Sequence, residues 1–324
     1  MENNNKARIV FLDSYTTNPG DLRWTALEQL GEFVHYKNVI SHDEIISCAK
    51  DADIIILNKA VIGREELEHL TRVKLICVAA TGYNSVDVEA CRVKGIPVCN
   101  VSGYSSPAVA QQVFALILNI RNKVQLYSDE VSKGDWSNQE FFTYQHQSWF
   151  ELKGKTFGIL GLGKIGEEVA NIALAFGMHV IAYRKNQAKG APAGVQLVEL
   201  DQLFQDSDIL SLHSVLNEET KGIINQEVLS KMKSNSILIN TGRGGLVVEE
   251  DLKEALLTKQ IFAAGLDVLS AEPPPKDHIL FGLENCIITP HQAWGSFDSR
   301  TRLVEGLAQN IRAFQESDLI NVVN

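Results

Sequence analysis

Three polar side chains in the C-terminal half of the chain each follow an apolar segment that predicts a buried strand. Arg243 lies in a glycine-rich turn, Glu272 precedes three prolines, and His291 follows Pro290. A guanidinium binds a carboxylate through two hydrogen bonds, and an imidazole donates or accepts a proton near neutral pH. A carboxylate hydrogen-bonded to that imidazole would orient it and stabilise its charged form. These residue types suit acid–base chemistry on a substrate that carries a carboxylate.

Each residue alone also has a structural explanation: a surface arginine, a solvated loop glutamate, or a structural histidine at a strand end. Together they supply what hydride transfer to a 2-oxo acid requires. These requirements are a cation for the carboxylate, an acid for the forming alkoxide, and a partner that keeps this acid charged and aimed. Ligands bind at strand ends in doubly wound sheets. Arg243, Glu272 and His291 are therefore the candidate catalytic residues.

A glycine motif in mid-chain predicts a dinucleotide site. Residues 158–166 read as an apolar strand, a Gly-x-Gly-x-x-Gly turn and a helix start. Gly161 would make the tight turn, Gly163 would let the backbone approach a pyrophosphate, and Gly166 would let the helix pack on the strand. The helix N-terminus would offer N–H groups and a positive dipole end to the phosphates. The motif alone would also permit a fortuitous match in another α/β enzyme.

Strand and helix patterns alternate in two stretches, which predicts an α/β fold with two doubly wound, Rossmann-like parallel sheets. Because the glycine motif follows a complete α/β segment, we expect a cofactor domain inserted into a substrate domain. The expected dinucleotide-binding domain is 105–294, and the substrate domain is 1–104 with 295–324. Strands are predicted at 8–12, 32–36, 53–57, 74–79, 96–100, 156–160, 178–183, 195–198, 208–212, 236–240, 262–266 and 286–289, and the last helix at 297–315.

Apolar residues at three- and four-residue spacing from about 106 to 131 predict one helix of about seven turns. An aromatic loop follows it, through residues 141–150. A helix of that length suits a bridge between domains or an oligomer interface. We therefore expect a homodimer.

Composition narrows the class of protein. A chain of 324 residues is comfortable for two domains. Its net charge of −10 argues against general affinity for nucleic acid or anionic membrane, and no apolar run approaches the ~20 residues of a membrane span. The five cysteines are odd in number and form no Cys-x-x-Cys, which favours reduced thiols in a cytoplasmic protein. No metal site and no signal peptide are expected.

The ordered motifs resemble those of the D-isomer-specific 2-hydroxyacid dehydrogenases over essentially the whole chain. They are Gly-Leu-Gly-Lys-Ile-Gly, Thr-Gly-Arg-Gly-Gly, Gly-Leu-Asp-Val, Glu-Pro-Pro and Thr-Pro-His, in that order. The resemblance implies a nicotinamide-dependent oxidoreductase in which Arg243 binds the substrate carboxylate. His291 would be the acid/base, and Glu272 its partner.

The resemblance also implies binding residues. Those expected at the cofactor are Lys164 and Ile165 at the pyrophosphate, His213, Ser214, Val215 and Leu216 on the adenine side, Thr241 and Gly242 along its length, and Asp267 near the nicotinamide amide. Those expected at the substrate are Lys59, Thr81 and Gly82, with Trp294 narrowing the pocket. A solvated loop lysine is an equally good interpretation of Lys59.

One position bears on the choice of cofactor. NAD enzymes usually place an acid after the second strand of the nucleotide domain, where it holds the ribose 2′-hydroxyl. This chain has Arg184 and Lys185 there. Two cations suit a 2′-phosphate, so we predict that NADPH is preferred over NADH. A plain surface Arg–Lys pair is the alternative.

Several segments look most like the glycerate dehydrogenase and hydroxypyruvate reductase branch of the family, so hydroxypyruvate and glyoxylate are the expected substrates. They are residues 79–88, residues 98–105 and Trp294. Glu272 stands where formate dehydrogenases have glutamine, and the chain ends at Asn324 without the regulatory domain of many phosphoglycerate dehydrogenases. The alternative function is an NAD(H)-sensing scaffold like the co-repressors related to this family, which can retain the same three residues.

Overall fold

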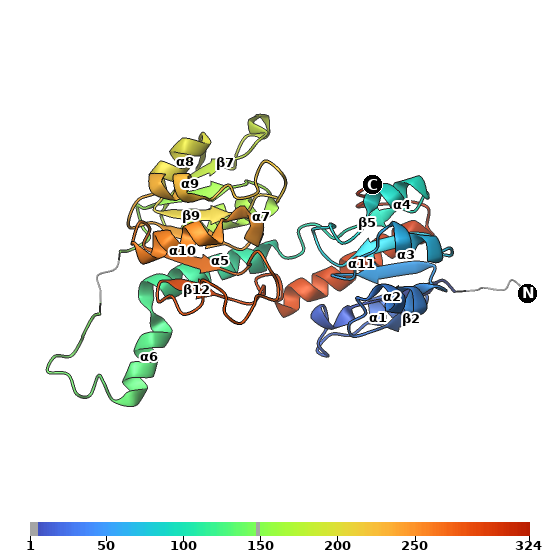
Figure 1. Ribbon diagram of the computed structural model, residues 1–324, viewed down its shortest axis with the longest axis horizontal. Coiled ribbons are helices and arrows are strands. Elements are labelled where there is room, and N and C mark those ends of the chain that lie inside the picture. Colours follow the sequence, from blue (N-terminus) through green and yellow to red (C-terminus); the bar gives the residue numbers. More distant parts are fainter. Residues whose placement is uncertain (1–5, 147–149) are drawn as a thin grey trace, which may run out of the picture. The chain divides into compact units, whose positions relative to one another are not determined.

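The computed structural model describes residues 6–146 and 150–324, and the chain divides into two compact units. The first unit runs to Ser105 and resumes at Gly295; the second spans Ser106–Trp294. Each unit holds one parallel sheet (Figure 1). The predicted α/β class with two doubly wound parallel sheets is therefore confirmed, and all twelve predicted strands are present.

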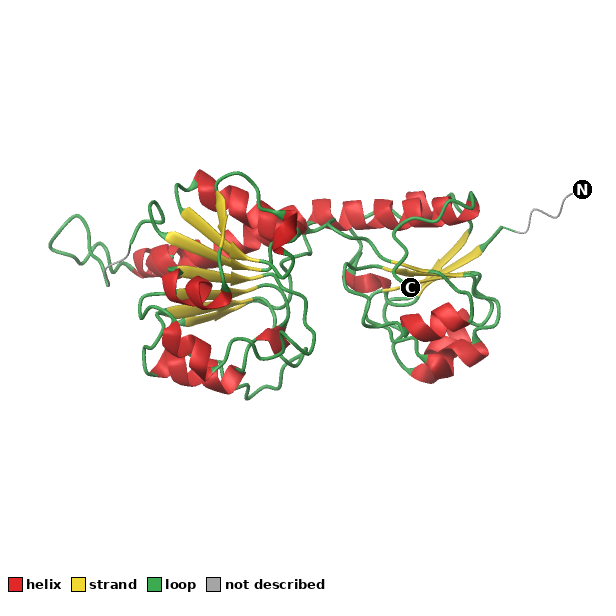
Figure 2. Cartoon of the chain, turned by 90° about the horizontal axis from the view of Figure 1, so that it is seen from above, coloured by secondary structure: helices red, strands yellow, loops and turns green. Residues whose placement is uncertain are grey.

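The first unit is built on a five-stranded sheet. Two of its strands, Ile54–Leu57 and Leu75–Val78, are apolar and fully buried, as a sheet covered on both faces requires. Figure 2 shows helices on both faces of this sheet. The strands are β1 (Arg8–Phe11), β2 (Glu32–His35), β3 (Ile54–Leu57), β4 (Leu75–Val78) and β5 (Val98–Cys99), in the order β2-β1-β3-β4-β5. The helices are α1 (Thr25–Glu28), α2 (His42–Ala49), α3 (Arg64–His69), α4 (Val88–Val93) and α11 (Phe297–Gln315), with a 3₁₀ turn η1 (Ser14–Thr16).

The second unit is built on a seven-stranded sheet. Its strands are β6 (Thr156–Leu160), β7 (His179–Tyr183), β8 (Val195–Leu197), β9 (Ile209–Leu212), β10 (Ile237–Asn240), β11 (Ala263–Leu266) and β12 (Cys286–Ile288). Its helices are α5 (Ser106–Asn122), α6 (Val124–Lys133), α7 (Lys164–Ala175), α8 (Leu200–Asp206), α9 (Gln226–Lys231) and α10 (Glu249–Leu257), with 3₁₀ turns η2 (Gln187–Lys189) and η3 (Gly244–Leu246). The strand order is β12-β11-β10-β9-β6-β7-β8, so the chain order reverses between β6 and β9. Such a switch point is where doubly wound sheets bind ligands.

The prediction of one seven-turn helix is wrong, because the helix is interrupted. α5 ends at Asn122, Lys123 adopts a left-handed backbone with φ 47°, and α6 begins at Val124. Arg121 anchors the end of α5: its guanidinium lies between the rings of Phe150 and Phe262. α6 has no buried residue, and Figure 1 shows it projecting from the rest of the second unit. The apolar spacing is helical throughout, but the left-handed residue Lys123, which no sequence signal marks, divides the segment into two helices.

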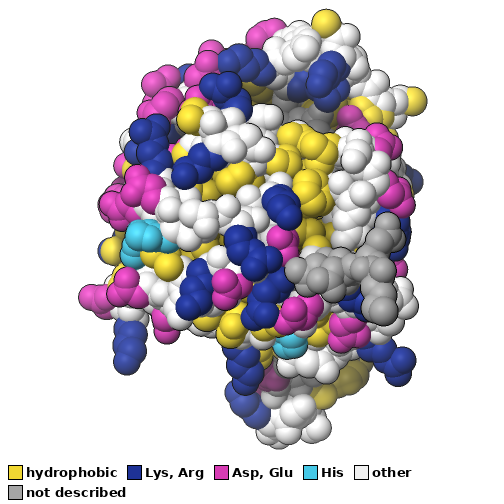
Figure 3. Space-filling view, turned by 90° about the vertical axis from the view of Figure 1, so that its right-hand side faces the viewer, with side chains coloured by type: hydrophobic (Ala, Val, Ile, Leu, Met, Phe, Trp, Pro, Cys, Tyr) yellow, Lys and Arg dark blue, Asp and Glu magenta, His cyan; other side chains and the backbone are white. Residues whose placement is uncertain are grey.

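The surface carries charges of both signs. On the face shown in Figure 3, acidic and basic side chains are interspersed, so neither sign dominates this face. Among the residues that the structure describes, none of the helices combines the length and apolar content that a membrane span needs.

Candidate active site

The loop after β6 is shaped by two glycines. Gly161 has φ 101°, and a Cβ built on it would lie 2.5 Å from the backbone nitrogen of Ser214. A Cβ on Gly166 would collide with the carbonyl oxygen of Gly161. Any side chain at either position would therefore displace the loop. The packing of the protein itself requires these two glycines.

Gly163 has no neighbour that would exclude a side chain. Its φ of −98° suits any residue, and nothing lies within 4 Å of the position that a Cβ would take. It is also the N-cap of α7, where it offers no side chain to the free N–H groups of the first turn. Open space at a helix N-terminus suits a phosphate group. The loop therefore has the form that a dinucleotide pyrophosphate requires.

Close backbone contacts continue along the same edge of the sheet. A Cβ on Gly245, in the turn after β10, would lie 2.9 Å from Leu216 in the loop after β9. A Cβ on Gly244 would collide with the carbonyl group of Leu269, in the loop after β11. The loops after β6, β9, β10 and β11 thus touch in sequence. This contact brings the Arg243 turn beside the segment that leads to Glu272.

Asn240 shapes the turn that carries Arg243. Its side chain, 1% exposed, accepts a hydrogen bond from the Gly242 nitrogen at 3.0 Å and donates to the Arg243 carbonyl at 2.9 Å. The Arg243 side chain is exposed and donates to the Gly242 carbonyl, but it forms no ion pair within the described residues. Beside it, the buried hydroxyl of Thr241 has no hydrogen-bond partner in the described part of the chain. The turn thus presents the guanidinium of Arg243 to a ligand, beside a buried hydroxyl that no described residue satisfies.

Glu272 and His291 form a direct pair. Glu272 Oε2 lies 2.6 Å from His291 Nδ1, and Oε1 accepts a hydrogen bond from the Leu269 nitrogen at 3.1 Å. The carboxylate therefore holds one ring nitrogen, and no hydrogen bond from the described residues reaches Nε2. An apolar pocket of about 650 Å³ borders the pair. This arrangement aims an imidazole whose outer nitrogen can exchange a proton with a ligand.

Asp267 holds the loop that carries His291. Its carboxylate, 1% exposed, accepts hydrogen bonds from Thr289 Oγ1 at 2.5 Å, the Gln292 nitrogen at 3.1 Å and the Ala293 nitrogen at 2.8 Å. Burial raises the pKa of Asp267, and these hydrogen bonds oppose that rise. The loop places the His291 backbone at φ 51°, a left-handed conformation that residues other than glycine rarely adopt. Both carboxylate oxygens of Asp267 are thus used to fix the position of His291.

The sequence motifs missed a second buried carboxylate, Glu249. It accepts hydrogen bonds from the nitrogen and the hydroxyl of Ser270, at 2.8 and 2.7 Å, and it lies 3.1 Å from His278 Nε2. Ser270 stands two residues before Glu272, so Glu249 supports the segment that presents this carboxylate. No local signal marks Glu249, because its partners are 21 and 29 residues away.

Arg184 and Lys185 both have protein partners. The Arg184 guanidinium donates to the carbonyl of Leu162, inside the glycine loop, at 2.5 Å and to that of Gly190 at 2.7 Å. The Lys185 ammonium pairs with Glu219. Arg184 therefore lies against the loop after β6, whereas Lys185 is directed to an exposed ion pair.

In the first unit, Lys59 follows β3, while Thr81 and Gly82 follow the adjacent strand β4. The Thr81 carbonyl accepts a hydrogen bond from the Asn100 side chain at 2.6 Å, and the Thr81 hydroxyl donates to the Val101 carbonyl at 3.2 Å. No acceptor within the described residues takes the backbone N–H groups of Thr81 and Gly82. Those N–H groups and the Lys59 ammonium therefore remain for an anionic ligand.

Comparison with known proteins assigns the family. Residues 114–293 match the family model described as D-isomer specific 2-hydroxyacid dehydrogenase, NAD binding domain. The hydroxypyruvate reductase of Blautia hydrogenotrophica is 42% identical over 321 residues, which cover 98% of this chain and 99% of that protein. The glycerate dehydrogenase of Methylorubrum extorquens is 37% identical, covering 90% of this chain and 92% of that protein. The chain belongs to the D-isomer specific 2-hydroxyacid dehydrogenases, and its second unit is an NAD(P)-binding oxidoreductase domain.

A solved structure of an acyclic imino acid reductase, in complex with NADPH and D-Arg, is similar to this chain. The TM-score is 0.87 and the sequence identity 32%, over 98% of this chain and 100% of that one.

The structure brings together some of the expected site residues within the second unit. The Arg243 turn, Glu272, His291 and Asp267 are joined through the contacts described above, and the glycine loop touches His213 and Ser214. Val215 is 73% exposed. Trp294 stands three residues after His291, at the end of the second unit.

The openness around Gly163 predicts that an added methyl group affects the ligand and not the fold. We expect Gly163→Ala to melt within a few degrees of the wild type, since alanine is only a poorer N-cap than glycine, but to bind NAD(P)H about tenfold more weakly, or ~1.4 kcal/mol. Gly161→Ala is the matched control, and its positive φ and close neighbours predict a lower melting temperature. Thermal unfolding and fluorescence titration measure both effects. Wild-type cofactor affinity in Gly163→Ala would contradict the assignment of this loop.

The environment of His213 predicts an unusual titration. Burial lowers the pKa of His213 from 6.5 to about 4, while the carboxylate of Glu66 raises the pKa of His42. Folding therefore disfavours a proton on His213, and its contribution to stability is present above pH 6.5 and is lost as the pH falls toward 4. NMR titration of the imidazole protons should give a midpoint below 6.5 for His213 and one above 6.5 for His42. The His213 signal is assigned as the one that disappears in His213→Asn. A His213 midpoint near 6.5 would contradict this environment.

Proposed function

We propose that the chain is an NAD(P)H-dependent reductase of small 2-oxo acids, with hydroxypyruvate and glyoxylate as its substrates. The observation that carries the proposal is the 2.6 Å pair of Glu272 and His291 beside the Arg243 turn. The names of the relatives, hydroxypyruvate reductase and glycerate dehydrogenase, support the choice of substrate. Three glyoxylate reductases, 34–35% identical to this chain, support the second substrate.

The catalytic roles follow from the contacts of each residue. A bound NAD(P)H supplies the hydride. Arg243 holds the substrate carboxylate in a bidentate contact and polarises the adjacent carbonyl. His291 delivers a proton from Nε2 to the forming alkoxide, and the Glu272 carboxylate at Nδ1 keeps the ring aimed.

The binding roles complete the proposal. We assign to the cofactor Gly161, Gly163, Lys164, Ile165, Gly166, Arg184, His213, Ser214, Val215, Thr241, Gly242, Asp267 and His291. We assign to the substrate Lys59, Thr81, Gly82, Arg243 and Trp294. Within the described part of the chain the Thr241 hydroxyl and the N–H groups of Thr81 and Gly82 have no hydrogen-bond partner, which supports their places in these sets.

We propose that NADPH is preferred over NADH. No carboxylate directly follows β7 in the chain, where NAD enzymes usually place the acid that holds the ribose 2′-hydroxyl. The Arg184 guanidinium already lies against the glycine loop, through the Leu162 carbonyl. A 2′-phosphate would replace one of its carbonyl partners with a stronger, charge-assisted one.

We propose a homodimer in the cytoplasm. α6 has no buried residue, and the loop after it exposes 69% of Phe141 and 88% of Phe142. Apolar side chains on a projecting segment suit a protein interface. The five free cysteines suit a reducing compartment.

The experiment that tests the function compares initial rates with hydroxypyruvate, glyoxylate, pyruvate and phosphohydroxypyruvate, each with NADPH and with NADH. We expect the fastest reduction with hydroxypyruvate and NADPH. His291→Asn should lower kcat by about two to four orders of magnitude, because the proton donor is lost. Arg184→Gln should lower the rate with NADPH more than the rate with NADH, so that the preference for NADPH falls.

Three outcomes would contradict parts of this proposal. Near-normal turnover by His291→Asn would remove its role as the acid. A wild-type preference for NADH would discard the role of Arg184 and keep the reductase. Cofactor binding without turnover of any oxo acid would favour the scaffold function.

The exposed segment after α5 yields a separate expectation. Light scattering should give twice the mass of the chain for the wild type. The double variant Phe141→Ser and Phe142→Ser should move toward the monomer mass, while its melting temperature stays within a few degrees because neither ring is buried. A wild-type monomer would rule out the dimer.

A further inference from the structure

A buried aspartate that no sequence motif marks holds the loop of Lys59. Asp13 lies two residues after β1, and its side chain is 3% exposed. Although Asp13 is the N-cap of η1, its carboxylate makes no capping hydrogen bond there. It accepts instead three consecutive backbone N–H groups of another loop, those of Asn58 at 2.7 Å, Lys59 at 2.5 Å and Ala60 at 2.8 Å.

Three N–H donors fix the backbone of this loop. A buried carboxylate is stable only when hydrogen bonds replace its water, and charge-assisted bonds are about twice as strong as neutral ones. The Asn58 side chain donates to the Ala79 carbonyl at 3.1 Å, which ties the loop to the end of β4. The loop is therefore held from both sides.

This hydrogen-bonded loop, residues 58–60, exposes a single cation. Asn58 and Ala60 are buried, while the side chain between them, Lys59, is exposed. The Lys59 ammonium forms no ion pair within the described residues, and the Asp13 carboxylate is occupied by backbone. A lysine fixed at its Cα loses less conformational entropy when it binds an anion than one on a mobile loop.

We propose that Asp13 is a positioning residue that directs Lys59 toward the carboxylate of the 2-oxo acid. The inference rests on the proposed function. Asp13 touches neither substrate nor cofactor, and its effect reaches the substrate through the backbone of residues 58–60. Because the contact is with the substrate carboxylate and not with the reacting carbonyl, the effect belongs in KM, not in kcat.

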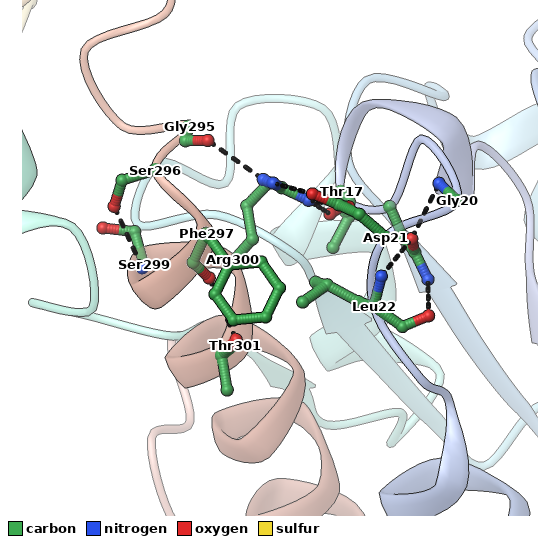
Figure 4. Close-up of polar contacts among 11 residues, drawn as sticks. Thr17, Gly20, Asp21, Leu22, Gly295, Ser296, Phe297, Ser299, Arg300 and Thr301 are labelled. Carbon is green, nitrogen blue, oxygen red and sulfur yellow. Dashed lines mark hydrogen bonds and ion pairs between the residues drawn. The ribbon is translucent and has the colours of Figure 1, made fainter.

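The same segment supplies a matched control. Asp21 lies in the loop after β1 as well, but it pairs with Arg300 on α11, through two bonds of 2.7 Å (Figure 4). Arg300 also donates to the carbonyls of Thr17 and Gly295. None of these hydrogen bonds involves residues 58–60. Asp21→Asn therefore loosens the loop after β1 without releasing Lys59.

The experiment is a double-mutant cycle with NAD(P)H and hydroxypyruvate. We expect Asp13→Asn and Lys59→Met each to raise KM about tenfold, with kcat changed less than about threefold and cofactor Kd unchanged. In the Lys59→Met background, Asp13→Asn should add less than about twofold, because the two residues act through one contact. Asp21→Asn should leave KM unchanged.

Several results would overturn the proposal. One is that Asp13→Asn raises KM as much in the Lys59→Met background as in the wild type. A second is that Asp13→Asn changes kcat and leaves KM unchanged. A third is that Asp21→Asn raises KM as much as Asp13→Asn does. If melting and cofactor binding show that Asp13→Asn does not fold, Asp13→Glu replaces it, because glutamate keeps the charge and shifts the carboxylate oxygens. Its effect on KM must likewise shrink to less than about twofold in the Lys59→Met background. If the wild type reduces no oxo acid, the proposed function is contradicted. Failure of the proposed function is thus distinguishable from failure of the proposed role of Asp13.

Discussion

The site in the second unit depends on how closely neighbouring strand-end loops approach one another. Gly161, Gly244 and Gly245 each stand where a Cβ would press into the next loop along the carboxyl edge of the sheet. Without side chains at these positions, the loops after β6, β9, β10 and β11 meet as one surface. The glycine loop, the Arg243 turn and the Glu272 segment hold their places through this contact. A side chain at any of the three would push these neighbouring loops apart.

Buried carboxylates hold the loops of the candidate site in place through hydrogen bonds. Asp267 holds the His291 loop, Glu249 holds the segment before Glu272, and Asp13 holds the Lys59 loop. All three accept backbone N–H groups from residues far away in the chain. A charge taken out of water needs several strong donors, so each carboxylate orders the loop that supplies them. The chain thus uses buried ionic groups to define the geometry of its loops.

The contrast between Gly163 and the other glycines separates folding from binding. Gly161 and Gly166 are required by the protein's own atoms, whereas nothing in the described chain requires Gly163. A glycine that packing does not explain points to a ligand that approaches the backbone. The buried Thr241 hydroxyl finds no partner among the residues that the structure describes, and burying a hydroxyl without a partner is costly, so it too indicates a ligand.

Local patterns in the chain predicted the fold class, all twelve strands, the glycine loop and the family. These follow from local periodicity and from motifs whose residues are adjacent in the chain. The sequence did not predict the break between α5 and α6, because the apolar spacing continues across the left-handed residue Lys123. Nor did it predict Asp13, Glu249 or the loop-holding role of Asp267. Their partners lie 21 to 47 residues away, so only the folded chain brings donor and acceptor together. Hydrogen bonds between distant segments depend on how strands pair and loops meet, and that is decided by tertiary packing.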